Sequence, residues 1–153
     1  MNKRNTVTGS TDQSYRGLSF WHDSVPESLT PRAALQHDEQ ADIAIVGAGY
    51  TGLWTAYYLK RQQPSLRIIV LESEIAGYGA SGRNGGWCSA FLSNIERWFA
   101  DPRHRPGAVR LQKLMFDTVR EVGEVARRES IDCQYEHSGA LEVAVNPAHL
   151  QRL

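Results

Sequence analysis

The chain is short of cysteine, of long apolar runs and of acidic or basic tracts. Its two cysteines, Cys88 and Cys133, have neither a CxxC pair nor a histidine-rich neighbourhood around them. This usage argues against a disulfide framework or a zinc site, and it favours a reducing compartment in which both thiols are ordinary packing residues. The N-terminus lacks the apolar core of a signal peptide, and no apolar run approaches the roughly 20 residues that span a membrane. We therefore expect a cytoplasmic protein without a membrane span.

Charge and histidine patterns exclude further classes of function. The 17 basic and 17 acidic side chains balance, so nothing predicts binding to nucleic acid or anionic lipid, and small molecules are the expected partners. No Ser/His/Asp or Cys/His arrangement can be argued from spacing, which leaves the catalytic residues unknown. The five histidines have no metal-ligand spacing, so no metal is expected, and we interpret them as surface or core residues: His22, His37, His104, His137 and His149.

The first forty residues have no regular pattern. Residues 1 to about 14 are polar and short of large apolar side chains, which predicts a flexible tail. From residue 15 to residue 40, aromatic residues such as Phe20 and Trp21 alternate with turn formers. We interpret this second stretch as an irregular leader that lies across a domain surface and serves packing only.

Regular structure is predicted from Ala41 onwards. Residues 43–46 form an unbroken apolar stretch, typical of a parallel strand buried on both faces. A glycine-rich turn follows, and apolar residues then recur at helical spacing until Pro64 ends the pattern. Residues 66–71 are again β-branched and apolar. This order of strand, helix and strand predicts a right-handed parallel crossover, and hence an α/β fold.

The last third of the chain has a different pattern. Residues 107–129 carry apolar side chains at three-or-four spacing, typical of a long amphipathic helix that faces a core. The stretches DCQYE and ALEVAV, separated by residues 137–139, predict a hairpin. Asn146 followed by Pro147 is typical of a helix N-cap and its first helical residue. Because a domain seldom ends as a helix begins, we expect Leu153 to lie inside a longer protein.

Three glycines at residues 47–52 form a GxGxxG run in an informative context. The run leaves an apolar strand and enters a helix, and Glu72 lies at the tip of the next strand, about 20 residues beyond Gly52, as a dinucleotide fingerprint requires. Gly47 permits the tight turn, Gly49 lets a pyrophosphate approach the backbone, and Gly52 lets the helix pack close to the sheet. The helix N-terminus near Tyr50 is then a site for phosphate.

Glu72 has a specific role in a dinucleotide site. The Glu72 carboxylate can accept hydrogen bonds from both hydroxyls of an adenosine ribose, and it would repel a 2′-phosphate, so NADP is disfavoured. The alternative is a glycine-rich turn that binds no ligand, although the strand, the glycines, the helix and the acidic residue all fit a dinucleotide site. NAD and FAD share the fingerprint, so the residues after Glu72 have to separate them.

The segments DIAIVGAGYTGLWTAYYLK and IIVLESEIAGYGASGRNGG resemble FAD-dependent oxidoreductases of the D-amino-acid oxidase type, in the branch that contains gamma-glutamylputrescine oxidase. The resemblance is strong from residue 41 to about 90, and SGALEVAV matches more loosely. It implies a Rossmann-like FAD-binding sheet of the glutathione-reductase type, incomplete here, with the start of a second α+β substrate domain. The segments expected are a tail and leader (1–40), an FAD-binding unit (41–106) and a truncated substrate domain (107–153).

The resemblance also implies which residues bind the cofactor. The ADP half of FAD would be held by Gly47, Gly49, Thr51, Gly52 and Glu72. The GASGRNGG loop would pass the pyrophosphate and lead to the flavin ring, with the path lined by Ala80, Ser81, Arg83, Asn84, Gly85 and Gly86. Ser81 can donate a hydrogen bond to a phosphate oxygen, and Arg83 can neutralise negative charge. Some relatives bind flavin covalently through a histidine in this loop, but none lies between Tyr78 and Trp87, so we expect noncovalent FAD.

The implied activity is oxidation of a C–N bond in an amine or amino acid, with most of the substrate pocket lying beyond Leu153. Two alternatives stay open. One is an NAD-dependent dehydrogenase module, for which the GASGRNGG loop has no evident use. The other is a non-catalytic or vestigial nucleotide-binding fragment, which the end of the chain within a predicted helix favours.

Overall fold

The computed structural model describes residues 12–139, 141 and 143–151. The chain divides into two compact units, Met1–Gly86 and Trp87–Leu153, and each is described by itself. The segment boundary expected at residue 106 stays a prediction. The flexible tail expected at the N-terminus lies mostly outside the described residues, because these begin at Asp12. None of the helices in the described part of the chain is both long and apolar enough to cross a membrane; the cytoplasmic location stays a prediction.

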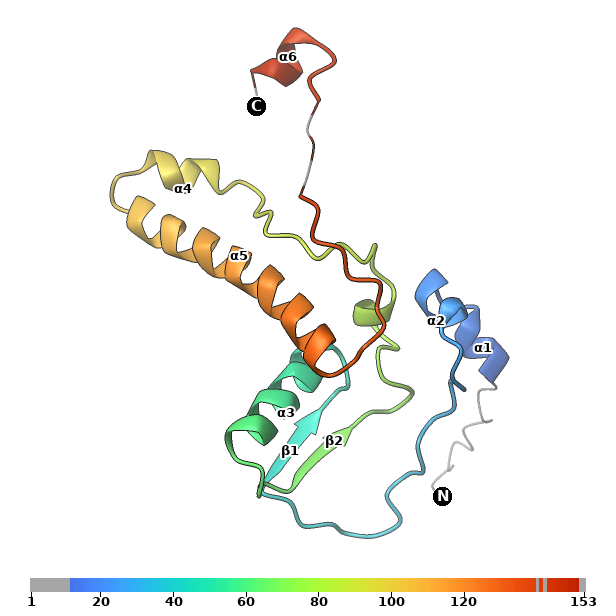
Figure 1. The fold of residues 1–153 in the computed structure, drawn as a ribbon. Coiled ribbons are helices and arrows are strands. Elements are labelled where there is room, and N and C mark those ends of the chain that lie inside the picture. Colours follow the sequence, from blue (N-terminus) through green and yellow to red (C-terminus); the bar gives the residue numbers. More distant parts are fainter. Residues whose placement is uncertain (1–11, 140, 142, 152–153) are drawn as a thin grey trace, which may run out of the picture. The chain divides into compact units, whose positions relative to one another are not determined.

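The first unit contains the predicted crossover. Strand β1 (Ile43–Val46) pairs in parallel with β2 (Ile68–Leu71), and helix α3 (Tyr50–Gln62) connects them and packs on them. Ile43 lies opposite Ile68, and Val46 opposite Leu71. In Figure 1 the two strands lie side by side with α3 next to them. The strand–helix–strand prediction is therefore confirmed, with the second strand two residues shorter than expected.

The two strands are less buried than their apolar sequence predicts. Side chains of β1 alternate between half-buried and exposed, and Val46 keeps 86% of its surface exposed. The described sheet has two strands, and α3 is the element that packs on them, so burial on both faces is not reached here. The structure thus supports an incomplete α/β fold rather than a complete doubly covered sheet.

The leader contains two short helices instead of being irregular throughout. They are α1 (Asp12–Arg16) and α2 (Phe20–Ser24), and residues 25–42 then run without regular structure to β1. Ser19 caps α2, because its side-chain oxygen accepts the amide proton of His22 at 3.2 Å. The best-buried side chains of the first unit come from this leader and from the segments after the two strands: Tyr15, His22, Ala48 and Ile75.

The second unit is helical. Helix α4 (Glu96–Ala100) packs on α5 (Arg105–Arg128), which confirms the long helix expected over 107–129, and α6 spans Pro147–Leu150. Asn146 caps α6 as predicted, since its side chain accepts the His149 amide proton at 2.9 Å. The apolar stripe of α5 is buried in part: its buried residues are Ala108, Val119, Gly123, Val125 and Ala126, while Leu111 and Leu114 stay exposed.

The hairpin expected after α5 is not formed in the described residues of that stretch; residues 140 and 142 lie outside them. Gln134 takes a left-handed backbone conformation (φ 52°), which interrupts the extended DCQYE run. The Tyr135 ring packs against Gly123, and its hydroxyl donates to the Val119 carbonyl at 2.7 Å. This stretch therefore docks on α5 rather than pairing as a strand. Cys88 and Cys133, expected to be packing residues, are both exposed.

Candidate cofactor-binding site

Two glycines are required where the chain leaves β1, Gly47 for its backbone conformation and Gly52 for close packing. Gly47 has a left-handed backbone (φ 96°), and its amide donates to the Leu71 carbonyl at 2.7 Å, which extends the pairing of the two strands by one residue. A Cβ on Gly52 would lie 2.1 Å from the Gly47 carbonyl oxygen and 3.3 Å from Ile45 Cγ2. Both observations match the expected roles, a tight turn and close packing of the helix.

Helix α3 begins without a carboxylate in its first turn, all of which is described, and without a cap from its own N-cap residue, Gly49. Thr51 lies exposed in that turn. The Tyr50 amide donates to Ser81 Oγ at 2.9 Å, and a Cβ on Gly49 would lie 2.9 Å from the same oxygen. Gly49 therefore leaves room for the Ser81 hydroxyl, a neighbour that the fingerprint does not predict.

Glu72 joins the end of β2 to the turn after β1. Its Oε2 accepts from the Ala48 amide at 2.8 Å, and its Oε1 accepts from the Ser73 amide at 2.9 Å and the Glu74 amide at 3.2 Å. The bond from Ala48, followed by those from Glu74 and Ser73, lowers the pKa of Glu72 against the opposing effect of burial. Glu72 is thus an ionised residue that holds the turn. Its Oε1 also accepts from the Ser73 hydroxyl at 3.3 Å, so Oε2, with one bond, is the oxygen left to accept from a ligand.

The loop at residues 77–86 folds against the start of α3. The Gly77 amide donates to the Ala48 carbonyl at 3.0 Å, and Ala80–Gly82 form a single turn of 3₁₀ helix, η1. Asn84 Nδ2 donates to the Tyr50 hydroxyl at 3.2 Å and to the Ser81 carbonyl at 2.8 Å, while its Oδ1 accepts from the Gly86 amide at 2.7 Å. Asn84 therefore organises the loop from within and ties it to α3.

The other predicted loop residues have different environments. The Ala80 carbonyl accepts from the Arg83 amide at 3.2 Å. Arg83 is exposed, and its guanidinium carbon lies 5.2 Å from the centroid of the Tyr78 ring. Gly86 has a left-handed backbone (φ 74°), whereas a Cβ on Gly85 would meet no heavy atom of the described chain within 4 Å. The site as a whole brings together the glycine turn, Glu72 and η1, with Arg83 and Gly85 at its exposed side.

Residues 42–153 match the family described as FAD dependent oxidoreductase (DAO). The chain belongs to this family. The resemblance recognised in the glycine turn and the GASGRNGG loop is thereby confirmed. The match begins one residue before β1 and includes Glu72, the loop and the helices of the second unit. The first 41 residues lie outside it.

Several curated proteins are similar to this member of the family. The gamma-glutamylputrescine oxidoreductase of Escherichia coli is 32% identical over 139 residues, which cover 88% of this chain and 31% of that protein. The probable oxidoreductase OrdL of Haemophilus influenzae is 30% identical over 120 residues, covering 75% and 26%. The thiamine thiazole synthase of Schizosaccharomyces pombe is 34% identical over 87 residues, covering 56% and 26%. The chain thus spans about a third or less of these relatives, and no solved structure matches it.

Sequence reasoning missed the leader residues that contact the loop. Ser19, Trp21 and His22 lie against residues 82–86, although the leader was expected to serve packing alone. In the sequence, the leader shows only a group of aromatic residues without periodicity, and this pattern does not indicate which other residues they contact. Sequence reasoning also missed Tyr50, because its hydroxyl meets Asn84 across 34 positions of sequence.

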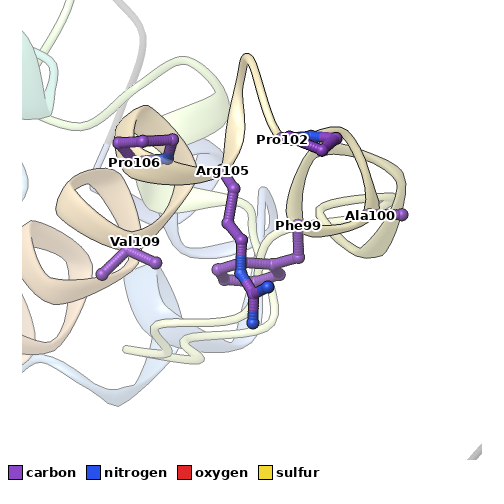
Figure 2. A pocket seen from close by; sticks show the side chains of 6 residues that line it. All are labelled: Phe99, Ala100, Pro102, Arg105, Pro106 and Val109. Carbon is purple, nitrogen blue, oxygen red and sulfur yellow. The ribbon is translucent and has the colours of Figure 1, made fainter.

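A hollow in the second unit lies apart from these residues in sequence. Figure 2 shows its lining from α4, the turn that follows and the first turns of α5: Phe99, Ala100, Pro102, Arg105, Pro106 and Val109. Its side chains are apolar except for Arg105, so it offers no acid–base pair. In the described part of the chain, no three His, Cys, Asp or Glu side chains gather closely enough to hold a metal ion.

Proposed function

We propose that this chain binds FAD noncovalently through the glycine turn, Glu72 and the loop at 80–86, within an oxidoreductase that oxidises a C–N bond of an amine or amino acid. The observation that carries the proposal is the meeting of a helix N-terminus that bears no acidic residue, an ionised carboxylate and the GASGRNGG loop in one member of the FAD-dependent family. Each part fits a different portion of the cofactor.

The start of α3 suits the diphosphate. The positive end of the helix lies there, and the first turn of this fully described helix carries no carboxylate to repel an anion. Ser81 Oγ accepts the Tyr50 amide proton, so its own hydroxyl proton is available for a phosphate oxygen. Ser81 would therefore bridge the helix terminus and the phosphate: its oxygen accepts from the Tyr50 amide, and its hydroxyl proton would be donated to the phosphate.

Glu72 suits the adenosine ribose. Oε1 already accepts three protons, from Ser73 and Glu74, whereas Oε2 accepts one, so Oε2 would accept from a ribose hydroxyl. Because the pKa of Glu72 is lowered, the group is ionised at neutral pH and would repel a 2′-phosphate. The site therefore favours FAD over NADP.

The loop suits the remainder of the cofactor. Arg83 is exposed and held over the Tyr78 ring, and its fixed positive charge would face either the diphosphate or the flavin. The absence of histidine between Tyr78 and Trp87 supports noncovalent binding. When bound, FAD supplies the hydride acceptor, and this chain would orient it. The amine class is supported by the name of the Escherichia coli relative, and we assign no catalytic residue in this chain.

The test is a titration of the purified full chain with FAD and with NAD⁺. We expect flavin absorbance bands and quenched flavin fluorescence with FAD, and no saturable binding of NAD⁺. Glu72→Ala should weaken FAD binding at least tenfold, because both the ribose acceptor and the anchor of the turn are lost. Glu124→Ala, which removes an exposed carboxylate of α5, is the matched control. Unchanged FAD affinity in Glu72→Ala would refute the assignment.

Activity needs a separate measurement. Under anaerobic conditions, an amine or amino-acid substrate should bleach the bound flavin, and a panel of diamines, γ-glutamylated amines and amino acids would identify the class. A second candidate is nucleotide binding without amine oxidation, since part of the chain also matches thiamine thiazole synthases, which are not named as oxidoreductases. FAD binding with no bleaching by any amine would support this second candidate, and preferred binding of NAD⁺ would support a dehydrogenase module.

A further inference from the structure

The leader helices, residues 12–24, make three side-chain hydrogen bonds to the segment that contains the loop. The Tyr15 hydroxyl donates to Glu74 Oε2 at 2.7 Å, Ser19 Oγ donates to the Gly82 carbonyl at 2.6 Å, and Trp21 Nε1 donates to the Asn84 carbonyl at 2.7 Å. Two of the three acceptors are backbone carbonyls. These bonds therefore fix the path of the loop backbone.

The same leader side chains fill the space beside two loop glycines. A Cβ on Gly82 would lie 2.7 Å from His22 Cε1, and one on Gly86 would lie 2.3 Å from Trp21 Cζ2. His22 is 5% exposed and lies 2.7 Å, Nδ1 to Oγ, from Ser19. Gly86 was expected to line the path to the flavin, and it is also required for contact with the leader; Gly82, for which no role was expected, is required for the same reason.

The leader is braced independently of the loop. Arg16 donates to the Val25 carbonyl at 2.8 Å and to the Glu27 carbonyl at 2.9 Å, and Asp12 Oδ1 accepts from the Leu29 amide at 2.7 Å. These bonds connect helix α1 to residues 25–29, which follow the two leader helices. The leader therefore has a conformation of its own, fixed by these bonds, and can hold the loop in position.

Two short routes connect the leader to the start of α3. Trp21 holds the Asn84 carbonyl, and the Asn84 side chain reaches the Tyr50 hydroxyl. Ser19 holds the Gly82 carbonyl, next to Ser81, whose hydroxyl accepts from the Tyr50 amide. Both routes end at the helix terminus that the proposed function assigns to the diphosphate.

We propose that Ser19, Trp21 and His22 are positioning residues for the cofactor loop, holding Gly82–Gly86 so that Ser81 and Asn84 reach Tyr50. The proposal rests on the proposed function for the identity of the ligand. It assigns a role to a segment that lies before the region matched by the family. These residues act through the loop and need not touch FAD.

The experiment compares Trp21→Phe and Ser19→Ala in the full chain. Trp21→Phe deletes the donor to the Asn84 carbonyl and keeps an aromatic ring. Ser19→Ala deletes the donor to the Gly82 carbonyl and, with it, the oxygen that caps α2. Phe20→Leu is the matched control, because Phe20 lies between them and is 72% exposed. Ser19→Thr, which keeps a hydroxyl, is the conservative variant that should restore wild-type behaviour.

Two readouts are measured. The first is the initial rate of tryptic cleavage after Arg83 in protein without FAD, compared with cleavage after Arg61 in α3. We expect the Arg83 rate to rise about fivefold for Trp21→Phe, from the net loss of one hydrogen bond, and at least as much for Ser19→Ala, which also loses the α2 cap, with no change at Arg61. The second is the FAD dissociation constant from fluorescence quenching, which should rise by a similar factor.

The outcomes separate this inference from the proposed function. If wild-type protein binds no FAD, the proposed function fails, and cleavage at Arg83 still tests whether the leader positions the loop. If wild-type protein binds FAD but the two variants match Phe20→Leu in both readouts, the inference is wrong. A rise in cleavage at Arg61 together with Arg83, or faster cleavage with an unchanged FAD dissociation constant, would also overturn it, since the residues would then serve stability alone.

Discussion

Replacing Gly52 with alanine should disturb both the fold and the cofactor site. The new Cβ would lie 2.1 Å from the Gly47 carbonyl oxygen, more than about 1 Å closer than an ordinary contact. The obstructing atom belongs to the backbone of a turn that is itself hydrogen-bonded to β2, so it cannot rotate away as a side chain would. Helix α3 would have to move off the turn.

The expected cost follows from two opposing effects. Overpacking of this kind costs about 1–3 kcal/mol. Alanine is favoured over glycine inside a helix by about 0.8–1.0 kcal/mol, which offsets part of that cost. Because the clash is with a backbone atom, the upper part of the overpacking range applies, about 2–3 kcal/mol, and we expect the free energy of unfolding to fall by about 1–2 kcal/mol. The effect on binding should be larger, because moving α3 displaces the Tyr50 amide from Ser81, and we expect FAD affinity to fall at least tenfold.

The assay pairs urea unfolding with an FAD titration of the full chain. Gly107→Ala is the matched control, since Gly107 lies in α5 outside the loop, its Cβ would meet no atom of the described chain within 4 Å and its backbone is not among the left-handed glycines. The control should be as stable as wild type or up to about 1 kcal/mol more stable, because it gains helix propensity without a clash. If Gly52→Ala were as stable as Gly107→Ala and bound FAD equally well, the argument from close packing of α3 on the turn would be wrong.

Two further predictions follow from single contacts. The lowered pKa of Glu72 means that its bonds contribute fully above the ordinary carboxyl value of 4.5 and are lost as pH falls through the lowered pKa. FAD should therefore be retained at pH 5 and released in a step below 4.5, a step that the pH profile of Glu72→Ala should lack; identical profiles would contradict it. Tyr135→Phe removes the donor to the Val119 carbonyl and should lower the free energy of unfolding by about 1 kcal/mol in urea, whereas an unchanged midpoint would rule this out.

The strand–helix–strand unit could be predicted because its determinants are local. Unbroken apolar runs, a glycine turn and a proline stop fall within one short stretch, and the structure places β1, α3 and β2 within it. Long helix α5 was predictable for the same reason, since a sustained three-or-four spacing fits no other regular element.

What failed depended on contacts between distant residues. The alternating pattern around Tyr135 fits a strand, but Gly123 in α5 leaves a space that the Tyr135 ring fills, and that complementarity is invisible from spacing. At the site, position along the chain indicated that Ser81 and Asn84 belong near the cofactor. Their convergence on Tyr50, and the support from Trp21 at 63 positions' distance, need the folded chain.

The Ala48 peptide has a consequence for how the length of this chain can change. Glu72 accepts from the Ala48 amide at 2.8 Å and the Gly77 amide donates to the Ala48 carbonyl at 3.0 Å, so both ends of the segment 72–77 are hydrogen-bonded to one residue of the turn. A single-residue insertion between Glu72 and Gly77 would have to break one of these two hydrogen bonds. By contrast, residues 31–36 run exposed and without regular structure, so that stretch can lengthen or shorten while the turn keeps its shape.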